Sequence, residues 1–215
     1  MKSAIATSTA LREEQTQINL ICAPGYPELI QDMITLNNDR KQTAFVIGDS
    51  PLTLASSSTE ITNWATNANF AAENGVQGLV SNSEYLGVYY PSGFATNLDG
   101  NSVYVPPSLS ALRTIAFNDQ VAYPWFAPAG INRGGLSTVL QAEQKLTQGN
   151  RDTLYSNNIN PIATLPKQGV VVYGQKTLQK EQSALDRVNV RRLMIELKSY
   201  IRQIADTVVF EQNTI

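Results

Sequence analysis

The residues whose types could do chemistry are a Gly-Asp-Ser string and four aspartates that could pair. Carboxylates at Asp49, Asp99, Asp119 and Asp152 could act as a general acid and a general base. Each lies among turn-forming residues, where aspartate is favoured because its side chain bonds nearby backbone. Gly48-Asp49-Ser50 follows an apolar run, but the sequence contains neither G-x-G-x-x-G nor G-x-x-x-x-G-K-[ST] for a phosphate loop. We interpret these aspartates as structural and expect no catalytic residue.

The sequence contains no histidine and a single cysteine, Cys22. Histidine is the commonest general base and metal ligand, and the usual partner of a nucleophilic serine or cysteine. Cys22 alone forms neither an internal disulfide nor a metal cluster, and the count fits a reducing compartment. The sequence therefore predicts no enzyme, no cofactor site and no metal site.

Composition points to contacts with other protein. Charged residues make up only 16% of the chain, so much of the surface is expected to be uncharged and polar. Sixteen Lys and Arg against 18 Asp and Glu give a net charge of −2, which provides no basic surface for nucleic acid or an anionic membrane. No apolar run approaches the roughly 18 residues that span a bilayer. We expect self-association, no direct nucleic-acid contact and no membrane insertion.

The first half of the sequence predicts a parallel βαβ unit. Residues 18–23 and 43–48 are short apolar runs closed by turn residues, as in buried strands. Pro27 suits the first position of a helix between them that runs to about Asn38. A strand, a helix and a strand within about 30 residues imply parallel pairing. The elements expected next are a helix from Ser58 or Thr59 to Asn74-Gly75, a strand at 85–90 and a helix from Pro107 to Phe117.

The second half predicts a helix at 136–148, a helical turn at 151–155, a strand at 170–174 and the start of a strand at 208–210. The clearest predicted helix is 185–207. Its expected apolar face, which could dock on a sheet, consists of Val190, Met194, Leu197, Ile201 and Ile204. Beside that face lies a basic stripe of Arg187, Arg191, Lys198 and Arg202. This stripe is either solvated or an interface to another subunit, and the case for nucleic acid is weak.

These elements predict an α/β fold with a mixed sheet flanked by helices. Residues 18–215 are expected to form a single domain after a lead-in or arm of residues 1–17. Residues 123–135 are too apolar for a mobile linker and should form an ordered loop. Trp125 and Phe126 in that loop could line a pocket, but aromatic residues between prolines more often anchor a loop to the core or to an interface. We therefore take both as interface candidates, together with the basic stripe.

Several uncommon strings occur in an order that resembles the tail sheath proteins of long-tailed contractile phages. The family strings are P-P-S, N-D, P-W-x-A-P-A-G-x-x-R-G, R-D-x-L-Y, I-N-P, G-x-K-T, D-R-[IV]-N-V-R-R-L and F-E-x-N. In this chain they begin at Pro106, Asn118, Pro124, Arg151, Ile159, Gly174, Asp186 and Phe210. The resemblance covers about residues 85 to 213.

The resemblance implies the α/β fold of the sheath's C-terminal, inner region, which lies against the tail tube. Family members form helical or ring homo-oligomers that contract and drive the tube through the host envelope, without a cofactor or an enzymatic step. The implied partners are other copies of the chain, the tail tube protein, and baseplate and tail terminator proteins. The implied location is the virion, after assembly in the host cytoplasm.

The chain departs from the family pattern at both ends. The outer N-terminal domains and the segment after Phe210-Glu211 are missing, so we expect a fragment truncated at its C-terminus. One alternative is the sheath of a related contractile injection system, of the bacteriocin or secretion type. Another is an α/β nucleotide-binding enzyme that uses the βαβ unit.

Overall fold

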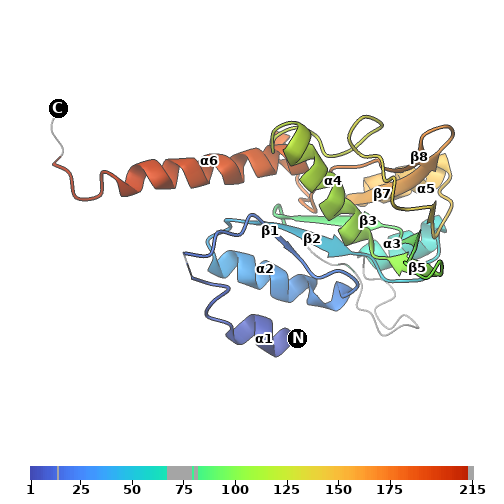
Figure 1. Cartoon of the computed structure of the whole chain (residues 1–215), viewed down its shortest axis with the longest axis horizontal. Helices are drawn as coiled ribbons and strands as arrows, with labels where there is room; N and C mark the ends of the chain where they lie inside the picture. The colour runs from blue at the N-terminus through green and yellow to red at the C-terminus, as the bar shows by residue number, and fades with distance from the viewer. Residues whose placement is uncertain (14, 67–78, 80–81, 213–215) are drawn as a thin grey trace.

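A five-stranded mixed sheet forms the centre of the computed structural model, which describes residues 1–13, 15–66, 79 and 82–212 (Figure 1). The strand order is β1-β2-β3-β7-β8. The first four strands are parallel, and β8 pairs antiparallel with β7. The strands are β1 (Leu20–Cys22), β2 (Phe45–Asp49), β3 (Leu86–Tyr90), β7 (Ile159–Leu165) and β8 (Gly169–Val172). The expected mixed sheet flanked by helices is confirmed.

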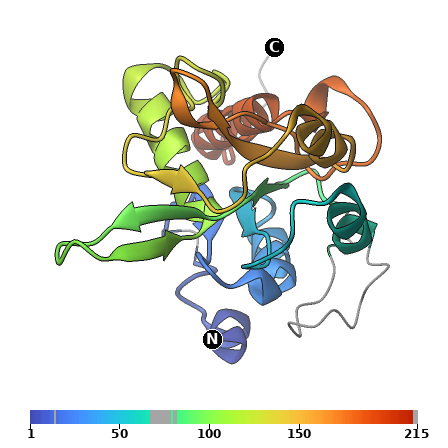
Figure 2. The same ribbon diagram turned by 90° about the vertical axis from the view of Figure 1, so that its right-hand side faces the viewer.

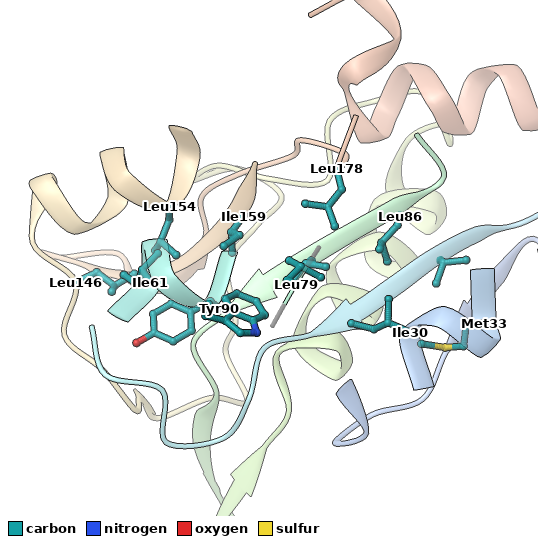
Figure 3. Packing of buried hydrophobic residues seen from close by; sticks show 13 residues of the cluster. Ile30, Met33, Ile61, Leu79, Leu86, Tyr90, Leu146, Leu154, Ile159 and Leu178 are labelled. Atoms are coloured by element: carbon teal, nitrogen blue, oxygen red, sulfur yellow. The ribbon is translucent and has the colours of Figure 1, made fainter. Parts of the chain in front are cut away.

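Helices cover both faces of this sheet. The helical elements are α1 (Lys2–Thr7), the 3-10 turn η1 (Pro27–Leu29), α2 (Ile30–Asp39), α3 (Ser58–Thr66), α4 (Pro107–Val121), α5 (Gln148–Ser156), the 3-10 turn η2 (Ala184–Asp186) and α6 (Val188–Asp206). On one face, α2, α3 and α5 pack in a single apolar cluster with residues of β2, β3 and β7 (Figure 3). On the other face, α4 and the start of α6 form a second cluster.

The expected βαβ unit is confirmed. β1 pairs parallel with β2 in the register Leu20↔Phe45, and η1 and α2 connect the two strands. Pro27 occupies the first position of η1, where its missing N–H needs no partner. The helix predicted from residue 58 is α3, and the predicted end of that helix at Asn74-Gly75 lies outside the described residues.

A second, three-stranded antiparallel sheet has the order β5-β4-β6. Its strands are β4 (Gly93–Thr96), β5 (Ser102–Val105) and β6 (Gln141–Ala142). The β4–β5 hairpin projects from the body of the molecule (Figure 2). Its turn is closed by Asn97, whose Oδ1 accepts from the backbone N–H groups of Asp99 at 3.0 Å and Asn101 at 2.8 Å. The sequence indicated turn-forming residues around Asp99 but not the strands on either side.

The helix predicted at 136–148 is wrong, because this segment consists of a turn, the short strand β6 and irregular backbone. The N–H of Leu136 donates to the carbonyl of Val170, and the N–H of Leu140 donates to that of Phe94, both at 2.8 Å. These partners lie on β8 and β4, so the segment's hydrogen bonds run between strands and not along a helix. Helix α5 begins only after Thr147, which caps it.

Two further differences concern strands. Residues 159–165, which the sequence left unassigned, form β7 despite Pro161. The neighbouring Asn160 is fully buried, and its amide group pairs with the backbone of Lys176, donating at 2.8 Å and accepting at 2.6 Å. The strand expected at 208–210 is wrong, because these residues form turns after α6.

The predicted docking face of α6 is also wrong. The buried residues of this helix are Val188, Arg191, Arg192 and Ile195, all in its first two turns. Every described residue from Leu197 onwards is exposed, and Figure 1 shows the helix running away from both sheets. Among the described residues, no helix combines the length and apolar character needed to cross a membrane.

The first 17 residues contact α2. Arg12 forms an ion pair with Asp39 at 2.8 Å. Arg40, just after α2, donates to the carbonyls of Leu11 at 2.5 Å and Thr16 at 2.6 Å. The division of the chain at residue 17 stays a prediction.

Asp49 joins three segments at the end of β2. Its carboxylate accepts from the backbone N–H of Gly25 at 2.7 Å, and from the backbone N–H and hydroxyl of Ser108 at 2.6 and 2.9 Å. Ser108 lies in the first turn of α4, where an acidic side chain satisfies free N–H groups. Burial raises the pKa of Asp49 above its ordinary value, and the hydrogen bonds from Gly25 and Ser108 partly offset this rise.

The raised pKa of Asp49 predicts a pH dependence of stability. A carboxyl group with a raised folded-state pKa favours folding most below its unfolded pKa, near 4, and that contribution is lost as the pH rises through the folded pKa. Asp49→Asn cannot ionise. In urea unfolding, we expect the stability of the wild type relative to Asp49→Asn to decrease as the pH rises from acidic to neutral. The exposed Asp152→Asn is the control, and a relative stability that increases with pH would contradict the assignment.

Candidate functional site

The loop after α4 presents three aromatic rings to solvent. We call residues 122–135 the aromatic loop. Trp125 and Phe126 are 39% and 40% exposed. Tyr123 stacks on Trp125 with ring centroids 4.7 Å apart and an interplanar angle of 3°, and the guanidinium of Arg133 lies 5.1 Å from the centre of the Phe126 ring. The rings support one another, so a partner that bound them would cost little conformational entropy.

Asparagine side chains from two helices hold the backbone of this loop. Asn118 in α4 is fully buried, and its Nδ2 donates to the carbonyls of Tyr123 at 3.1 Å and Phe126 at 3.3 Å. Asn189 in α6 donates to the carbonyl of Trp125 at 3.1 Å. The loop is therefore ordered, as its composition predicted.

A bidentate ion pair connects the same two helices, α4 and α6, beneath the loop. Arg192 in α6 is 5% exposed and donates to both carboxylate oxygens of Asp119 in α4, at 2.7 and 2.5 Å. It also donates to the carbonyl of Pro124 at 3.3 Å. Bidentate arginine–carboxylate pairs fix geometry as well as adding energy. The expectation that Asp119 lies in a turn is wrong, because it lies in α4.

The end of the aromatic loop packs against β8 without room for a side chain. A Cβ on Gly134 would lie 2.5 Å from the carbonyl oxygen of Val172 and 2.7 Å from that of Gly130. The N–H of Gly130 donates to Val172 at 2.9 Å, and the N–H of Val172 donates to Gly134 at 2.8 Å. The loop is thus fixed to the sheet at one end and to α4 and α6 at the other.

The basic stripe divides into a pair that meets at Tyr85 and two residues that lie elsewhere on α6. Arg191 is 4% exposed and pairs with Glu84 at 2.7 Å, while its guanidinium lies 4.7 Å from the centre of the Tyr85 ring. Lys198 donates to the Tyr85 hydroxyl at 2.8 Å. Arg191 and Lys198 therefore converge on Tyr85, and Arg191 makes its contacts within its own chain.

Arg187 and Arg202 lie elsewhere on α6. Arg187, at the N-terminal end of the helix, pairs with Asp186 at 3.2 Å and donates to the Tyr155 hydroxyl. Arg202 lies on the exposed second half. A role for any of these four residues, or for Trp125 and Phe126, in contacts between subunits stays a prediction.

The sequence reasoning missed the residues that hold the loop: Asn118, Asn189 and Arg192. All three lie in strings that carried the resemblance, N-D and D-R-[IV]-N-V-R-R-L. The adjacent arginines Arg191 and Arg192 were a usable signal. Neighbouring residues of a helix point about 100° apart, so Arg192 had to lie outside the stripe that contains Arg191.

Three further features of the described residues bear on chemistry: the Cys22 thiol, the side chains that could bind a metal, and an open hollow. Burial, followed by the charge of Asp49, raises the pKa of the Cys22 thiol, so little thiolate forms near neutral pH. In the part of the chain that the structure describes, no three His, Cys, Asp or Glu side chains gather to hold a metal ion. An open hollow of about 570 Å³ is lined by polar side chains including Gln31, Asn38 and Glu84, and Glu84 already pairs with Arg191.

Comparison with solved structures identifies the fold as that of contractile sheath proteins. The chain aligns with the sheath complex of an extracellular contractile injection system, PVC, in its contracted state, with a TM-score of 0.72 and 20% identity. This alignment covers 99% of the chain and 53% of the PVC chain.

Sequence comparison gives the family. The model of the phage tail sheath protein central domain matches residues 2–178, so the chain belongs to the phage tail sheath protein family. It is 42% identical over 110 residues to the tail sheath protein of Vibrio phage KVP40, which covers 51% of the chain and 16% of that protein. It is 33% identical over 154 residues to the tail sheath protein of Enterobacteria phage T4, which covers 64% of the chain and 23% of that protein. The chain thus spans less than a quarter of each of these two relatives.

The ion pair beneath the loop predicts a stability difference between two positions of α6. Arg192→Met removes the bonds to Asp119 and Pro124, and we expect it to lower the free energy of unfolding by about 1.5–3 kcal/mol. Arg202→Met, the same substitution on the exposed half of the helix, should change it by less than about 0.5 kcal/mol. Urea unfolding measures both, and equal effects would show that the ion pair does not hold the structure.

Adjacent glycines provide a second matched pair. Gly134→Ala places a Cβ against backbone oxygens, so we expect a loss of about 1–3 kcal/mol in the free energy of unfolding. The added Cβ of Gly135→Ala meets nothing within 4 Å, and we expect little change. Thermal unfolding of both variants tests this, and a stable Gly134→Ala protein would disprove the close approach.

Proposed function

We propose that the chain is part of a structural subunit of a contractile phage tail sheath, which self-assembles around the tail tube and contracts to drive the tube through the host envelope during genome delivery. The observation that carries this proposal is the family match over residues 2–178, together with the sheath proteins of two phages as relatives. The whole protein would be a virion component assembled in the host cytoplasm.

The geometry of the described site supports a structural role. The Nδ2 groups of Asn118 and Asn189 donate to backbone carbonyls of the aromatic loop, and Arg192 bonds Asp119 and the carbonyl of Pro124, so the three hold a surface in place. Side chains that served a reaction would instead converge on a space that a substrate could enter. The proposal therefore includes no enzymatic activity and no cofactor.

The proposed partners are other copies of the chain, the tail tube protein, and baseplate and tail terminator proteins. The inner position against the tube, and residues 18–215 as a single α/β domain, are part of the same proposal. The low share of charged residues and the exposed rings of the aromatic loop support extensive protein contacts.

A second candidate is the sheath of a related contractile injection system. The specific observation in its favour is the TM-score of 0.72 with the PVC sheath complex. The identities of 42% and 33% to phage proteins favour the phage sheath. The genes beside this one distinguish the two, since a phage sheath is encoded near capsid genes. For an α/β nucleotide-binding enzyme, the test is a thermal-shift screen with nucleotides.

Electron microscopy tests the proposed function. The protein expressed from its whole reading frame, alone and with the tail tube protein, should form stacked rings or helical tubes. Trp125→Ala and Arg202→Ala remove exposed side chains of the predicted interface, and we expect fewer or shorter assemblies from each.

Asp152→Ala, on the exposed side of α5, is the control for these two variants. A protein that stays monodisperse even with its tube protein would overturn the sheath function. Normal assembly by both variants would instead remove Trp125 and Arg202 from the interface and leave the function standing.

A further inference from the structure

The turn of the β4–β5 hairpin contains Asp99-Gly100, the one Asp-Gly pair in the sequence. In such a pair the backbone nitrogen of glycine can attack the side-chain carboxyl of the aspartate and close a five-membered succinimide ring. Glycine favours this reaction because it has no Cβ to obstruct the approach. The surrounding structure decides whether the two groups can meet, since the reaction needs both to be free to move.

The space around this pair is open. Residues 98–102 are all exposed, and the hairpin that carries them projects from the body of the molecule (Figure 2). A Cβ added to Gly100 would meet nothing within 4 Å. Water and a moving carboxyl group can therefore reach both sides of the peptide bond between Asp99 and Gly100.

The bonds that hold the two reacting groups stay within the turn itself. The N–H of Gly100 donates to the carbonyl of Asn97 at 3.1 Å, and the carboxylate of Asp99 accepts a long bond of 3.4 Å from Nδ2 of Asn97. Exposed bonds of this kind open locally, without unfolding of the sheet, because few apolar contacts are lost when they break. The nitrogen and the carboxyl are thus released by a small, local motion.

The Asp49-Ser50 pair at the end of β2 provides the contrast. Serine is also a small residue after aspartate, but Asp49 and Ser50 are each only 2% exposed. The N–H of Ser50 donates to the carbonyl of Tyr89 at 3.3 Å, and the carboxylate of Asp49 is held by Gly25 and Ser108. Both reacting groups are therefore fixed to other segments of the chain, so reaction here requires the sheet and α4 to come apart.

We propose that Asp99 is a modification site, at which aspartate converts spontaneously to isoaspartate in the folded protein. The nitrogen of Gly100 attacks Cγ of Asp99, so an N–Cγ bond forms, the nitrogen loses its proton and a carboxyl oxygen leaves as water. Hydrolysis of the succinimide returns that water. Addition at Cγ restores aspartate, whereas addition at the backbone carbonyl carbon breaks its bond to nitrogen and leaves isoaspartate. The mass of the chain is unchanged, and the only co-reactant is water.

The product changes the shape of the turn. Isoaspartate adds one methylene to the backbone between positions 99 and 100 and leaves a carboxylate on the α-carbon. Oδ1 of Asn97 accepts from the N–H groups of Asp99 and Asn101, which lie on either side of that link, so a longer link shifts at least one of these bonds. The exposed tip of the hairpin is therefore altered while the body of the protein is not. This inference is independent of the proposed function.

Ageing of the folded 215-residue chain for weeks at neutral pH and physiological temperature tests the proposal. Endoproteinase Asp-N cuts before aspartate but not before isoaspartate, so a peptide map reports the conversion at each position. We expect cleavage before Asp99 to be lost at a rate within roughly tenfold of that in a free peptide of residues 96–103. Cleavage before Asp49 should persist in the folded chain and be lost only in urea. Asn74-Gly75 can also form isoaspartate, by loss of ammonia, and mass spectrometry of the peptides separates the two sites.

Two variants provide the controls, and circular dichroism confirms that each folds. Asp99→Glu keeps the carboxylate but would need a six-membered ring, so we expect isoaspartyl methyltransferase to label the Asp-N peptides around position 99 at least roughly tenfold less than in the wild type. Asp152→Glu, on the exposed side of α5, should leave the conversion at Asp99 unchanged.

Three results would overturn the assignment. The first is a folded chain that keeps full cleavage before Asp99 while the free peptide converts. The second is labelling around position 99 that survives Asp99→Glu. The third is conversion of Asp49 in the folded chain as fast as that of Asp99, which would show that the fold does not select the site.

Discussion

The structure depends on burial of the central sheet on both faces. Every residue of β2 and β3 is buried, as in parallel strands covered by helices on each side. Along β2, Phe45 and Ile47 join the cluster formed with α4 and α6, while Val46 joins the cluster formed with α2, α3 and α5. This alternation fixes which helices lie on which face, and it places the loops that connect them at the edges of the sheet.

Buried polar side chains then fix these loops. Asp49 joins β2 to the start of α4, Asn160 joins β7 to the segment after β8, and Asn118 holds the aromatic loop. Each group bonds backbone donors or acceptors of a neighbouring segment, and a buried polar group left unpaired costs about 1–3 kcal/mol. These bonds attach the loops to the sheet and to α4.

Several residues that fix the loops lie in the strings that resemble sheath proteins. Gly134 and Asn189, together with the pair Asp119–Arg192, determine where the rings of Trp125 and Phe126 lie. A protein that works by packing against copies of itself requires a surface of constant shape, because interface energy depends on complementarity. This explains how strings with no catalytic pattern can still identify a family.

The sequence alone determined the elements whose signals are local. The βαβ unit, β3, β8 and the extent of α6 followed from apolar runs, prolines and glycines, and the order of strings indicated the family. For the candidate site, the sequence located the aromatic loop and its order. It missed the residues that hold that loop. The partners of Arg192 and Asn189 lie 73 and 64 residues away along the chain. Those of Asn118 lie only five and eight residues away, but the fold of the loop decides that they meet it.

Only the tertiary structure decided the elements whose hydrogen bonds run to distant segments. Leu136, Val139, Ala142 and Leu146 repeat every three or four residues, as in a helix, yet the backbone there bonds to β4 and β8. β7 forms despite Pro161 because its neighbours β3 and β8 supply the pairing. The periodicity of α6 identified an apolar stripe but not its partner, because the face that a helix buries depends on what lies beside it.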